Sequence, residues 1–130
     1  MGEAPGGRAR RLLVIDDDLN VQRSIGRQLK GAVRLEISFE TNPEKALQVI
    51  AAGDWDLVLC DIKMKPLSGL EVLTKIRTER PSLPVIMLTG FVDDQIIERA
   101  QALGCSDFLI KPVRKEQLIG SISRVLDSPG

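Results

Sequence analysis

Three short, almost entirely apolar runs constrain the fold of this chain most strongly. They are LLVI at 12–15, DLVLC at 56–60 and LPVIML at 83–88, and each stops where polar residues begin. Runs of this length with no polar face are typical of strands covered on both sides, as in a parallel sheet. The sequence therefore predicts a sheet interior built from segments far apart in the chain.

Amphipathic helices are predicted between these strands. In the first, Val21, Ile25 and Leu29 recur at helical spacing and Gly31 follows as a C-cap. Asn42-Pro43 has the pattern of an N-cap with proline at the first helical position. The other expected helices lie at about 68–79, 97–103 and 115–126. Two further strands are expected, an alternating one at 34–40, placed at a sheet edge, and one at 107–110.

Strict alternation of five strands with five helices indicates βαβ crossovers. With interior first, third and fourth strands and an edge second strand, it favours a flavodoxin-like strand order of 2-1-3-4-5. We expect one doubly wound α/β domain over residues 12–127, in which five helices flank a five-stranded parallel sheet. Residues 1–11 are expected to be a disordered leader and residues 128–130 a C-terminal tail.

Composition excludes several classes of function. The 130 residues include no histidine, so catalysis by Ser-His-Asp or Cys-His and histidine-ligated metals are ruled out. The 18 basic and 18 acidic residues balance, which gives no overall attraction to nucleic acid or to a membrane. No apolar run reaches the roughly 18 residues of a membrane span, and we expect a cytoplasmic protein. Cys60 and Cys105 lie in apolar contexts and are expected to be buried thiols.

Polar residues follow four of the five predicted strands. Asp16, Asp17 and Asp18 follow the first, whereas Asp61, Thr89-Gly90 and Lys111-Pro112 follow the third, fourth and fifth. In an open parallel sheet, ligands bind beyond the carboxyl ends of the strands at the switch in strand order. Carboxylates gathered there need a cation, and an all-oxygen site suits Mg²⁺. A metal, an ammonium and a hydroxyl around one carboxylate describe phosphoryl transfer to an aspartate.

These residues resemble the receiver domain of bacterial two-component response regulators. The resemblance covers about residues 11–127, and the order and separations of the matching segments are those of the family. The segments are LLVIDDD (12–18), LVLCDIKM...G (57–69), VIMLTG (85–90) and DFLIKP (107–112).

The resemblance implies a role for each site residue. Asp61 would be the phosphoacceptor. Asp16 and Asp17 would be the acidic pair, with Asp17 the more direct Mg²⁺ ligand, and the backbone carbonyl of Lys63 would be a third protein ligand. The family commonly reads D-x-x-M-P after the acceptor, whereas this chain reads DIKMKP, with Lys65 where proline is expected.

Three further roles follow from the resemblance. Thr89 would be the switch hydroxyl, Lys111 would pair with the phosphoryl group, and Phe108 would be the aromatic switch. Because phenylalanine has no hydroxyl to anchor an outward state, we expect its inward rotamer to be partly populated without phosphate. Asp18 is expected to cap the first helix rather than to bind metal.

Three other functions fit the same residues less well. A haloacid-dehalogenase-like phosphatase would attack with Asp16, and Asp16-x-Asp18 matches half of its motif, but Asn20 stands where Thr or Val is required. A nucleotide-binding module lacks its glycine-rich motifs. A protein-interaction domain that is never phosphorylated would be expected to lack a site residue, and none is lacking.

The resemblance also implies partners. The expected phosphodonor is a histidine kinase or a histidine phosphotransfer protein. An output domain or target protein would dock on the face made by 97–103, 107–110 and 115–126, and a homodimer is compatible with this. No binding of nucleic acid or membrane by this domain alone is expected. The domain would be a signalling phosphoacceptor rather than an enzyme, although it assists its own phosphorylation and dephosphorylation.

Overall fold

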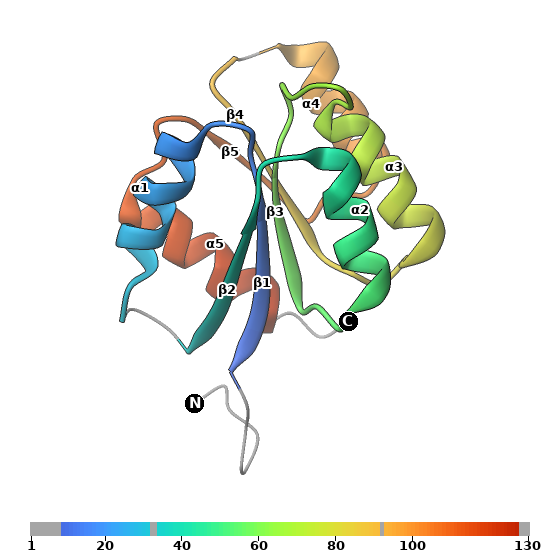
Figure 1. The fold of residues 1–130 in the computed structure, drawn as a ribbon. Coiled ribbons are helices and arrows are strands. Elements are labelled where there is room, and N and C mark those ends of the chain that lie inside the picture. Colours follow the sequence, from blue (N-terminus) through green and yellow to red (C-terminus); the bar gives the residue numbers. More distant parts are fainter. Residues whose placement is uncertain (1–8, 32–33, 92, 128–130) are drawn as a thin grey trace.

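A computed structural model describes residues 9–31, 34–91 and 93–127, which form one twisted parallel sheet with helices on both faces (Figure 1). The strand order is β2-β1-β3-β4-β5, so the predicted flavodoxin-like topology is confirmed. The strands are β1 (Arg10–Ile15), β2 (Leu35–Glu40), β3 (Leu57–Asp61), β4 (Val85–Thr89) and β5 (Asp107–Ile110).

The five helices divide between the two faces of the sheet. One face packs on α1 and α5 through residues such as Ile25 and Leu118, and the other packs on α2, α3 and α4 through residues such as Ile50, Leu73 and Ala100. The helices are α1 (Leu19–Leu29), α2 (Pro43–Ala52), α3 (Gly69–Glu79), α4 (Asp94–Ala102) and α5 (Lys115–Asp127). Alternate residues of each central strand enter opposite cores, which explains their lack of a polar face.

The edge position predicted for the alternating strand is confirmed, since β2 stands at one end of the strand order and pairs with β1 alone among the described strands. The first strand is longer than expected and begins at Arg10. Backbone pairing extends it, because the Arg10 amide donates to the Arg34 carbonyl at 3.1 Å and the Arg11 carbonyl accepts the Asp56 N–H at 2.9 Å. Arg10 and Arg11 therefore belong to the sheet rather than to a leader. Residues 1–8 of that predicted leader lie outside the described residues, as does the predicted tail.

Local capping explains where the helices begin. Asp18, Asn42, Ser68 and Asp93 are N-caps whose side chains accept backbone N–H groups of α1, α2, α3 and α4. The expected cap role of Asp18 is thus confirmed. These caps fix the entry of each helix just beyond a strand, which also fixes the loops that carry the polar strand ends.

Two expectations about buried residues need correction. Cys60 is buried as predicted, but Cys105 is only partly buried because it lies two residues before β5, a strand at the sheet edge; both thiols are free. On α1, Gln22 is buried beside Ile25 and Leu29, whereas Val21 is only partly buried. Gln22 tolerates burial because its side-chain amide donates to the Asp16 carbonyl at 3.0 Å.

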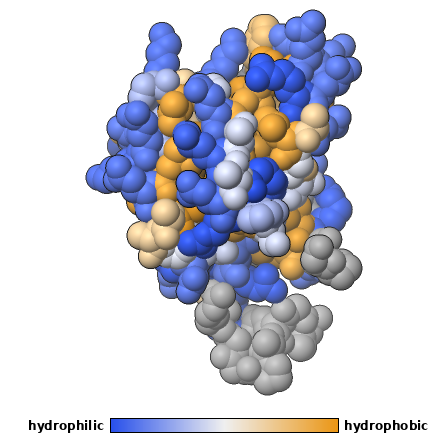
Figure 2. All heavy atoms as spheres, turned by 90° about the vertical axis from the view of Figure 1, so that its right-hand side faces the viewer, coloured by the Kyte–Doolittle hydropathy of each residue, from blue (hydrophilic) through white to orange (hydrophobic). Residues whose placement is uncertain are grey.

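The face of the molecule on the α2 and α3 side is mostly polar (Figure 2). Figure 2 shows hydrophilic side chains over most of the face on the α2 and α3 side, with hydrophobic strips between them. No helix in the described part of the chain combines the length and the apolar character needed to cross a bilayer.

Candidate functional site

The carboxyl ends of β1 and β3 bring three aspartates together. Asp16, Asp17 and Asp61 each place a carboxylate oxygen within 4.8 Å of the others, although the strands are far apart in sequence. Asp16 is fully buried and Asp61 is 5 % exposed, while Asp17 is exposed. The cluster forms because β1 and β3 are neighbours in the sheet. The all-oxygen donor set, with one exposed carboxylate, suits Mg²⁺.

Lys111 supplies the positive charge of the site. Its Nζ lies 2.8 Å from Asp16 Oδ2 and 3.1 Å from Asp61 Oδ1. The lysine follows β5, and its backbone amide donates to the Thr89 carbonyl at 2.7 Å, which continues the β4–β5 pairing past the strand end. The side chain is 20 % exposed, so this ion pair is largely shielded from water.

Both carboxylate oxygens of Asp16 have donors. Oδ2 accepts from Lys111, and Oδ1 accepts the Asp18 N–H at 2.9 Å. The exposed carboxylate of Asp17 is the more open of the pair for a cation. The role of Asp17 as the more direct Mg²⁺ ligand stays a prediction.

The loop after Asp61 closes tightly on the strand end through Gly69. A Cβ at this position would lie 2.0 Å from the Asp61 carbonyl oxygen and 2.7 Å from Ile62 Cα, so only glycine fits. The Gly69 amide donates to the Ile62 carbonyl at 2.7 Å. The Lys65-Pro66 peptide bond within this loop is cis, as is Lys111-Pro112. Coordination by the Lys63 carbonyl stays a prediction.

Burial and neighbouring charges shift the pKa values of Asp61 and Lys111. Burial and the neighbouring Asp16 raise the pKa of Asp61, although the Lys111 ammonium acts in the opposite direction. Burial alone would lower the pKa of Lys111, but its hydrogen bond to Asp16 and the charge of Asp61 outweigh burial, so this pKa is raised. Lys111 therefore stays protonated at neutral pH. Burial also raises the pKa of the Cys60 thiol strongly, so this thiol is not a reactive nucleophile.

The Thr89 side chain lies at the end of β4 but is not bonded to Asp61. Its hydroxyl donates to the Phe91 carbonyl at 3.3 Å and accepts the Phe91 N–H at 3.1 Å. Thr89 is 2 % exposed, so these bonds are shielded from solvent. The structure thus brings Asp16, Asp17, Asp61 and Lys111 into one cluster, with the Thr89 hydroxyl turned toward the next loop.

Phe108 lies in β5 opposite Met87, on the same face of the sheet as Thr89. It is partly buried and packs against the core between the sheet and α2, α3 and α4. The preceding Asp107 carboxylate accepts the Ser121 hydroxyl at 2.5 Å and Arg124 Nη2 at 2.6 Å, both from α5. Although burial opposes it, these bonds lower the pKa of Asp107. They tie the base of β5 to α5, next to Phe108.

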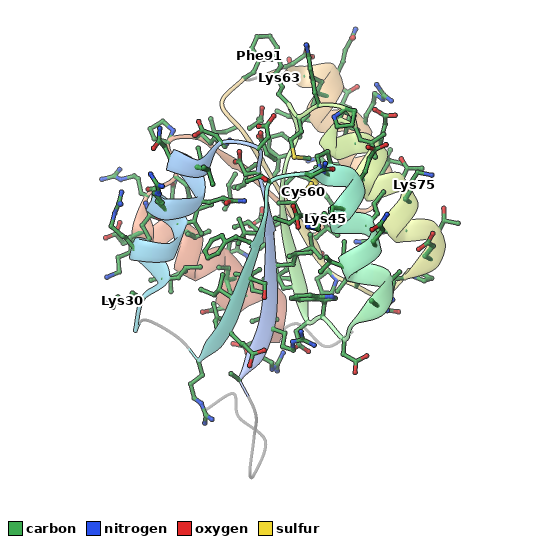
Figure 3. All side chains as sticks on the ribbon, viewed as in Figure 1. Lys30, Lys45, Cys60, Lys63, Lys75 and Phe91 are labelled. Carbon is green, nitrogen blue, oxygen red and sulfur yellow. The ribbon has the colours of Figure 1, made fainter. Side chains whose placement is uncertain are left out.

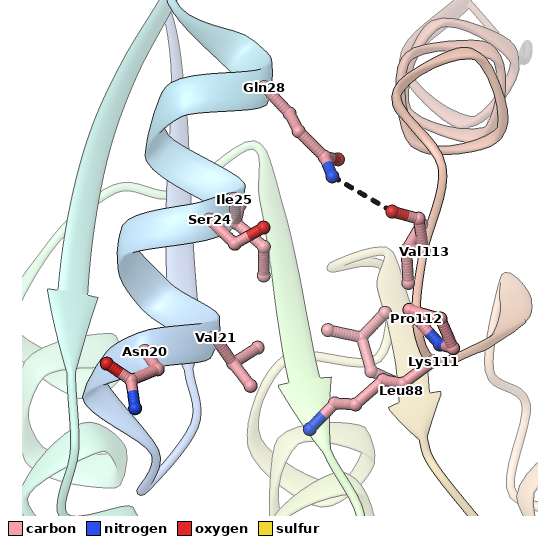
Figure 4. A pocket seen from close by; sticks show the side chains of 9 residues that line it. All are labelled: Asn20, Val21, Ser24, Ile25, Gln28, Leu88, Lys111, Pro112 and Val113. Atoms are coloured by element: carbon pink, nitrogen blue, oxygen red, sulfur yellow. Dashed lines mark hydrogen bonds between the residues drawn. The ribbon is translucent and has the colours of Figure 1, made fainter.

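A cavity of about 410 Å³ flanks the Lys111 side chain between α1 and the chain that follows β5 (Figure 4). The Gln28 amide closes one end by donating to the Val113 carbonyl at 2.9 Å. The walls are largely apolar and the lining residues are Asn20, Val21, Ser24, Ile25, Gln28, Leu88, Lys111, Pro112 and Val113. The cavity holds the aliphatic part of Lys111 on the α1 side of the acidic cluster.

Comparison with known proteins assigns the chain that carries this site to a family. The sequence profile of the response regulator receiver domain matches residues 12–123. This chain belongs to the response regulator receiver domain family. In such domains an aspartate takes up a phosphoryl group as part of two-component signalling. The chain is a signalling phosphoacceptor domain of that class, with the flavodoxin-like fold expected from its sequence.

Relatives of this receiver domain include transcriptional regulators. The transcriptional regulatory protein ZraR of Klebsiella oxytoca is 33 % identical over 115 residues, which is 88 % of this chain and 26 % of ZraR. The DNA-binding transcriptional regulator NtrC of Rhizobium meliloti is 32 % identical over 118 residues, 91 % of this chain and 24 % of NtrC. The chain thus spans about a quarter of the length of these relatives.

Solved structures match the receiver domain over nearly its whole length. A CheY-like response regulator receiver domain protein from Methanospirillum hungatei superposes with a TM-score of 0.86 at 28 % identity, covering 92 % of this chain and 94 % of that one. The response regulator TrrA from Thermotoga maritima, solved in complex with Mg²⁺ and BeF, gives a TM-score of 0.81 at 28 % identity, over 89 % of this chain and 98 % of TrrA.

Sequence reasoning missed two features of this site. The first is Gln22, whose polar side chain on an apolar helix face was the available signal. The second is a contact between Lys63 and Phe91, where Lys63 Nζ lies 4.0 Å from the centre of the Phe91 ring. No sequence signal joins these two loop residues, because they follow different strands and are both exposed.

Proposed function

We propose that Asp61 is the aspartate of this receiver domain that accepts the phosphoryl group. The observation that carries the proposal is the contact between Asp61 Oδ1 and Lys111 Nζ at 3.1 Å inside a cluster of three carboxylates. Asp61 combines burial with a neighbouring ammonium and a neighbouring exposed carboxylate. Asp16 is a weaker candidate, since both its oxygens already have donors.

The reaction uses Asp61 as a nucleophile. A carboxylate oxygen attacks the phosphorus of the donor, a P–O bond forms, and the bond from phosphorus to the donor's leaving atom breaks. The leaving atom is an imidazole nitrogen for a phosphohistidine or a carboxylate oxygen for acetyl phosphate. Lys111 stays protonated and is placed to neutralise charge on the transferred oxygens. Attack of water on the same phosphorus returns the Asp61 carboxylate and inorganic phosphate.

The donor set fits the magnesium ion expected for this family. Asp17 and Asp61 would hold it together with the Lys63 carbonyl, while Asp16 supports the cluster through Lys111 and the Asp18 amide. When bound, Mg²⁺ supplies positive charge that balances the carboxylates and the phosphoryl oxygens. This chain's own part is to hold the carboxylates within 4.8 Å of each other and to keep Lys111 charged.

The donor is inferred to be a histidine kinase or a histidine phosphotransfer protein, acting in the cytoplasm. The response is a population shift in which Thr89 turns its hydroxyl to the phosphoryl group and Phe108 moves further inward. The face made by α4, β5 and α5 would then change its affinity for an output domain, a target protein or a second copy of the chain. Ile110, 40 % exposed at the end of β5, belongs to this face.

The acceptor assignment is tested by incubating the protein with acetyl phosphate and Mg²⁺ and measuring its intact mass. The native chain is expected to gain one phosphoryl group, and Asp61→Asn none. Asp54→Asn is the matched control, because it makes the same chemical change at an exposed position before β3. A mass gain in Asp61→Asn equal to that of the control would contradict the assignment.

A further inference from the structure

Two exposed side chains join the loops that follow Asp61 and Thr89. Lys63 lies two residues after Asp61, Phe91 lies two residues after Thr89, and the Lys63 ammonium sits 4.0 Å from the centre of the Phe91 ring. Figure 3 shows both side chains beyond the carboxyl ends of the strands. At this distance the cation and the ring attract each other. Phe91 is 48 % exposed, so the ring forms this contact at the surface of the protein.

The same residue 91 also holds the Thr89 hydroxyl. Its carbonyl accepts that hydroxyl and its amide donates to it, so the orientation of Thr89 depends on the position of the Phe91 backbone. Thr89 must give up its donation to the Phe91 carbonyl before it can donate to a phosphoryl group on Asp61. Whatever fixes Phe91 therefore opposes the turn of Thr89.

We propose that Lys63 and Phe91 form a latch that keeps the Thr89 hydroxyl turned away from Asp61, and that a phosphoryl group on Asp61 releases it. The inference rests on the proposed role of Asp61. Release follows from charge: a phosphoryl group brings roughly two negative charges to a position two residues from Lys63. That charge attracts the ammonium away from the neutral ring, which frees Phe91 and with it the hydroxyl of Thr89.

The latch predicts an energetic coupling between Lys63 and Phe91 in the unphosphorylated state alone. The probe is fluoroberyllate, bound in the presence of Mg²⁺ as a substitute for the phosphoryl group and measured by calorimetry. Phe91→Leu removes the ring without changing charge, so it should raise fluoroberyllate affinity about two- to fivefold, the range of an exposed cation–ring contact. In a Lys63→Met background, the same Phe91→Leu change should give no gain.

Lys65→Met is the matched control for Lys63→Met. Both lysines are exposed in the same loop, so both substitutions remove one positive charge near the site. Phe91→Leu should keep its two- to fivefold gain in the Lys65→Met background. Equal gains in the Lys63→Met and Lys65→Met backgrounds would overturn the latch while leaving the role of Asp61 intact. Equal fluoroberyllate binding by the native chain and by Asp61→Asn would overturn both proposals.

Discussion

The two sides of the site are held in place by contacts of very different strength. On the acceptor side (Asp16, Asp61 and Lys111), the charged side chains are at most 20 % exposed and make ion pairs at 2.8 and 3.1 Å. The response side consists of Thr89, Phe91 and Phe108. There, hydroxyl bonds of 3.1 and 3.3 Å and one exposed cation–ring contact hold the loop.

The difference corresponds to two separate functions, phosphoryl transfer and the conformational response to it. Phosphoryl transfer needs its charged groups in place before the donor arrives, because electrostatic stabilisation depends on preorganisation. A conformational response needs two states separated by only a few kcal/mol. The short, shielded ion pairs of the acceptor side suit the first requirement, and the weaker contacts of the response side suit the second.

Removing the ammonium group of Lys111 should have the largest effect on stability. Lys111→Met leaves the buried carboxylates of Asp16 and Asp61 without a counter-charge, so the free energy of unfolding should fall by roughly 2–4 kcal/mol. Urea denaturation at neutral pH without Mg²⁺ measures this. Lys115→Met is the control at an exposed position and should change stability by less than about 0.5 kcal/mol. A similar loss in both variants would show that the ion pair does not organise the acceptor side.

A side chain at Gly69 should disturb the acceptor side sterically. In Gly69→Ala the new Cβ meets the Asp61 carbonyl oxygen, so either the loop or the strand end must move, at a cost of about 1–3 kcal/mol. Gly120→Ala is the matched control, because its Cβ meets nothing within 4 Å and alanine favours the helix. Chemical denaturation should show Gly69→Ala destabilised and Gly120→Ala unchanged or more stable. Two equal effects would contradict the close approach.

Neutralising Asp61 should stabilise the fold, by roughly 0.5–2 kcal/mol at pH 7 without Mg²⁺. Burial and Asp16 raise the pKa of Asp61 above its ordinary value of 3.8. The folded state therefore binds this proton more tightly than the unfolded state, and native stability falls as pH rises from the ordinary pKa through the raised one. The gain in the free energy of unfolding of Asp61→Asn over the native chain should be largest at a pH above the raised pKa of Asp61. It should vanish at a pH below the ordinary pKa.

Urea denaturation of the native chain and of Asp61→Asn, over about pH 4 to 8, measures this advantage. Asp54→Asn, at an exposed position, should follow the native curve throughout. An advantage of Asp61→Asn that grows as the pH falls would have the wrong sign for a carboxylate beside Asp16.

These three predictions concern a region that the sequence describes well. Asp16, Asp61 and Lys111 were predictable because each lies at the carboxyl end of a strand or directly after it, and strand order alone brings parallel strand ends together. The order itself followed from which runs lack a polar face. The start of β1 at Arg10 was not predictable from apolar patterning, since charged residues pair by their backbone as readily as apolar ones.

The response side was predictable only in its residue types. The sequence contains Thr89 and Phe108 at the family's positions, but the bonds of the Thr89 hydroxyl depend on a rotamer and on the path of the following loop. The contact of Lys63 with Phe91 joins two loops that are close only in the folded chain. Such contacts between exposed side chains leave no periodic pattern in the sequence.

The smallest effect on stability is expected for substitutions of Thr89, which should instead change the movement of the Phe108 side chain. Thr89→Ala should lower the free energy of unfolding by no more than about 1 kcal/mol and still bind fluoroberyllate. In Thr89→Ala, fluoroberyllate binding should leave the ¹⁹F signal of fluorophenylalanine at position 108 largely unshifted. Thr89→Ser keeps the hydroxyl, so fluoroberyllate binding should still shift this signal. Signals are assigned with Phe39→Leu and Phe91→Leu. An equal shift in both variants would show that Phe108 moves independently of Thr89.

We propose that Asp61, and not a neighbouring carboxylate, accepts the phosphoryl group. Borohydride reduction converts an acyl phosphate on an aspartate side chain to homoserine, so peptide mass spectrometry after reaction with acetyl phosphate and Mg²⁺ identifies the acceptor directly. Homoserine at position 61 alone is the expected result. Homoserine at position 16, the acceptor in a phosphatase mechanism, or at position 17 would contradict the account.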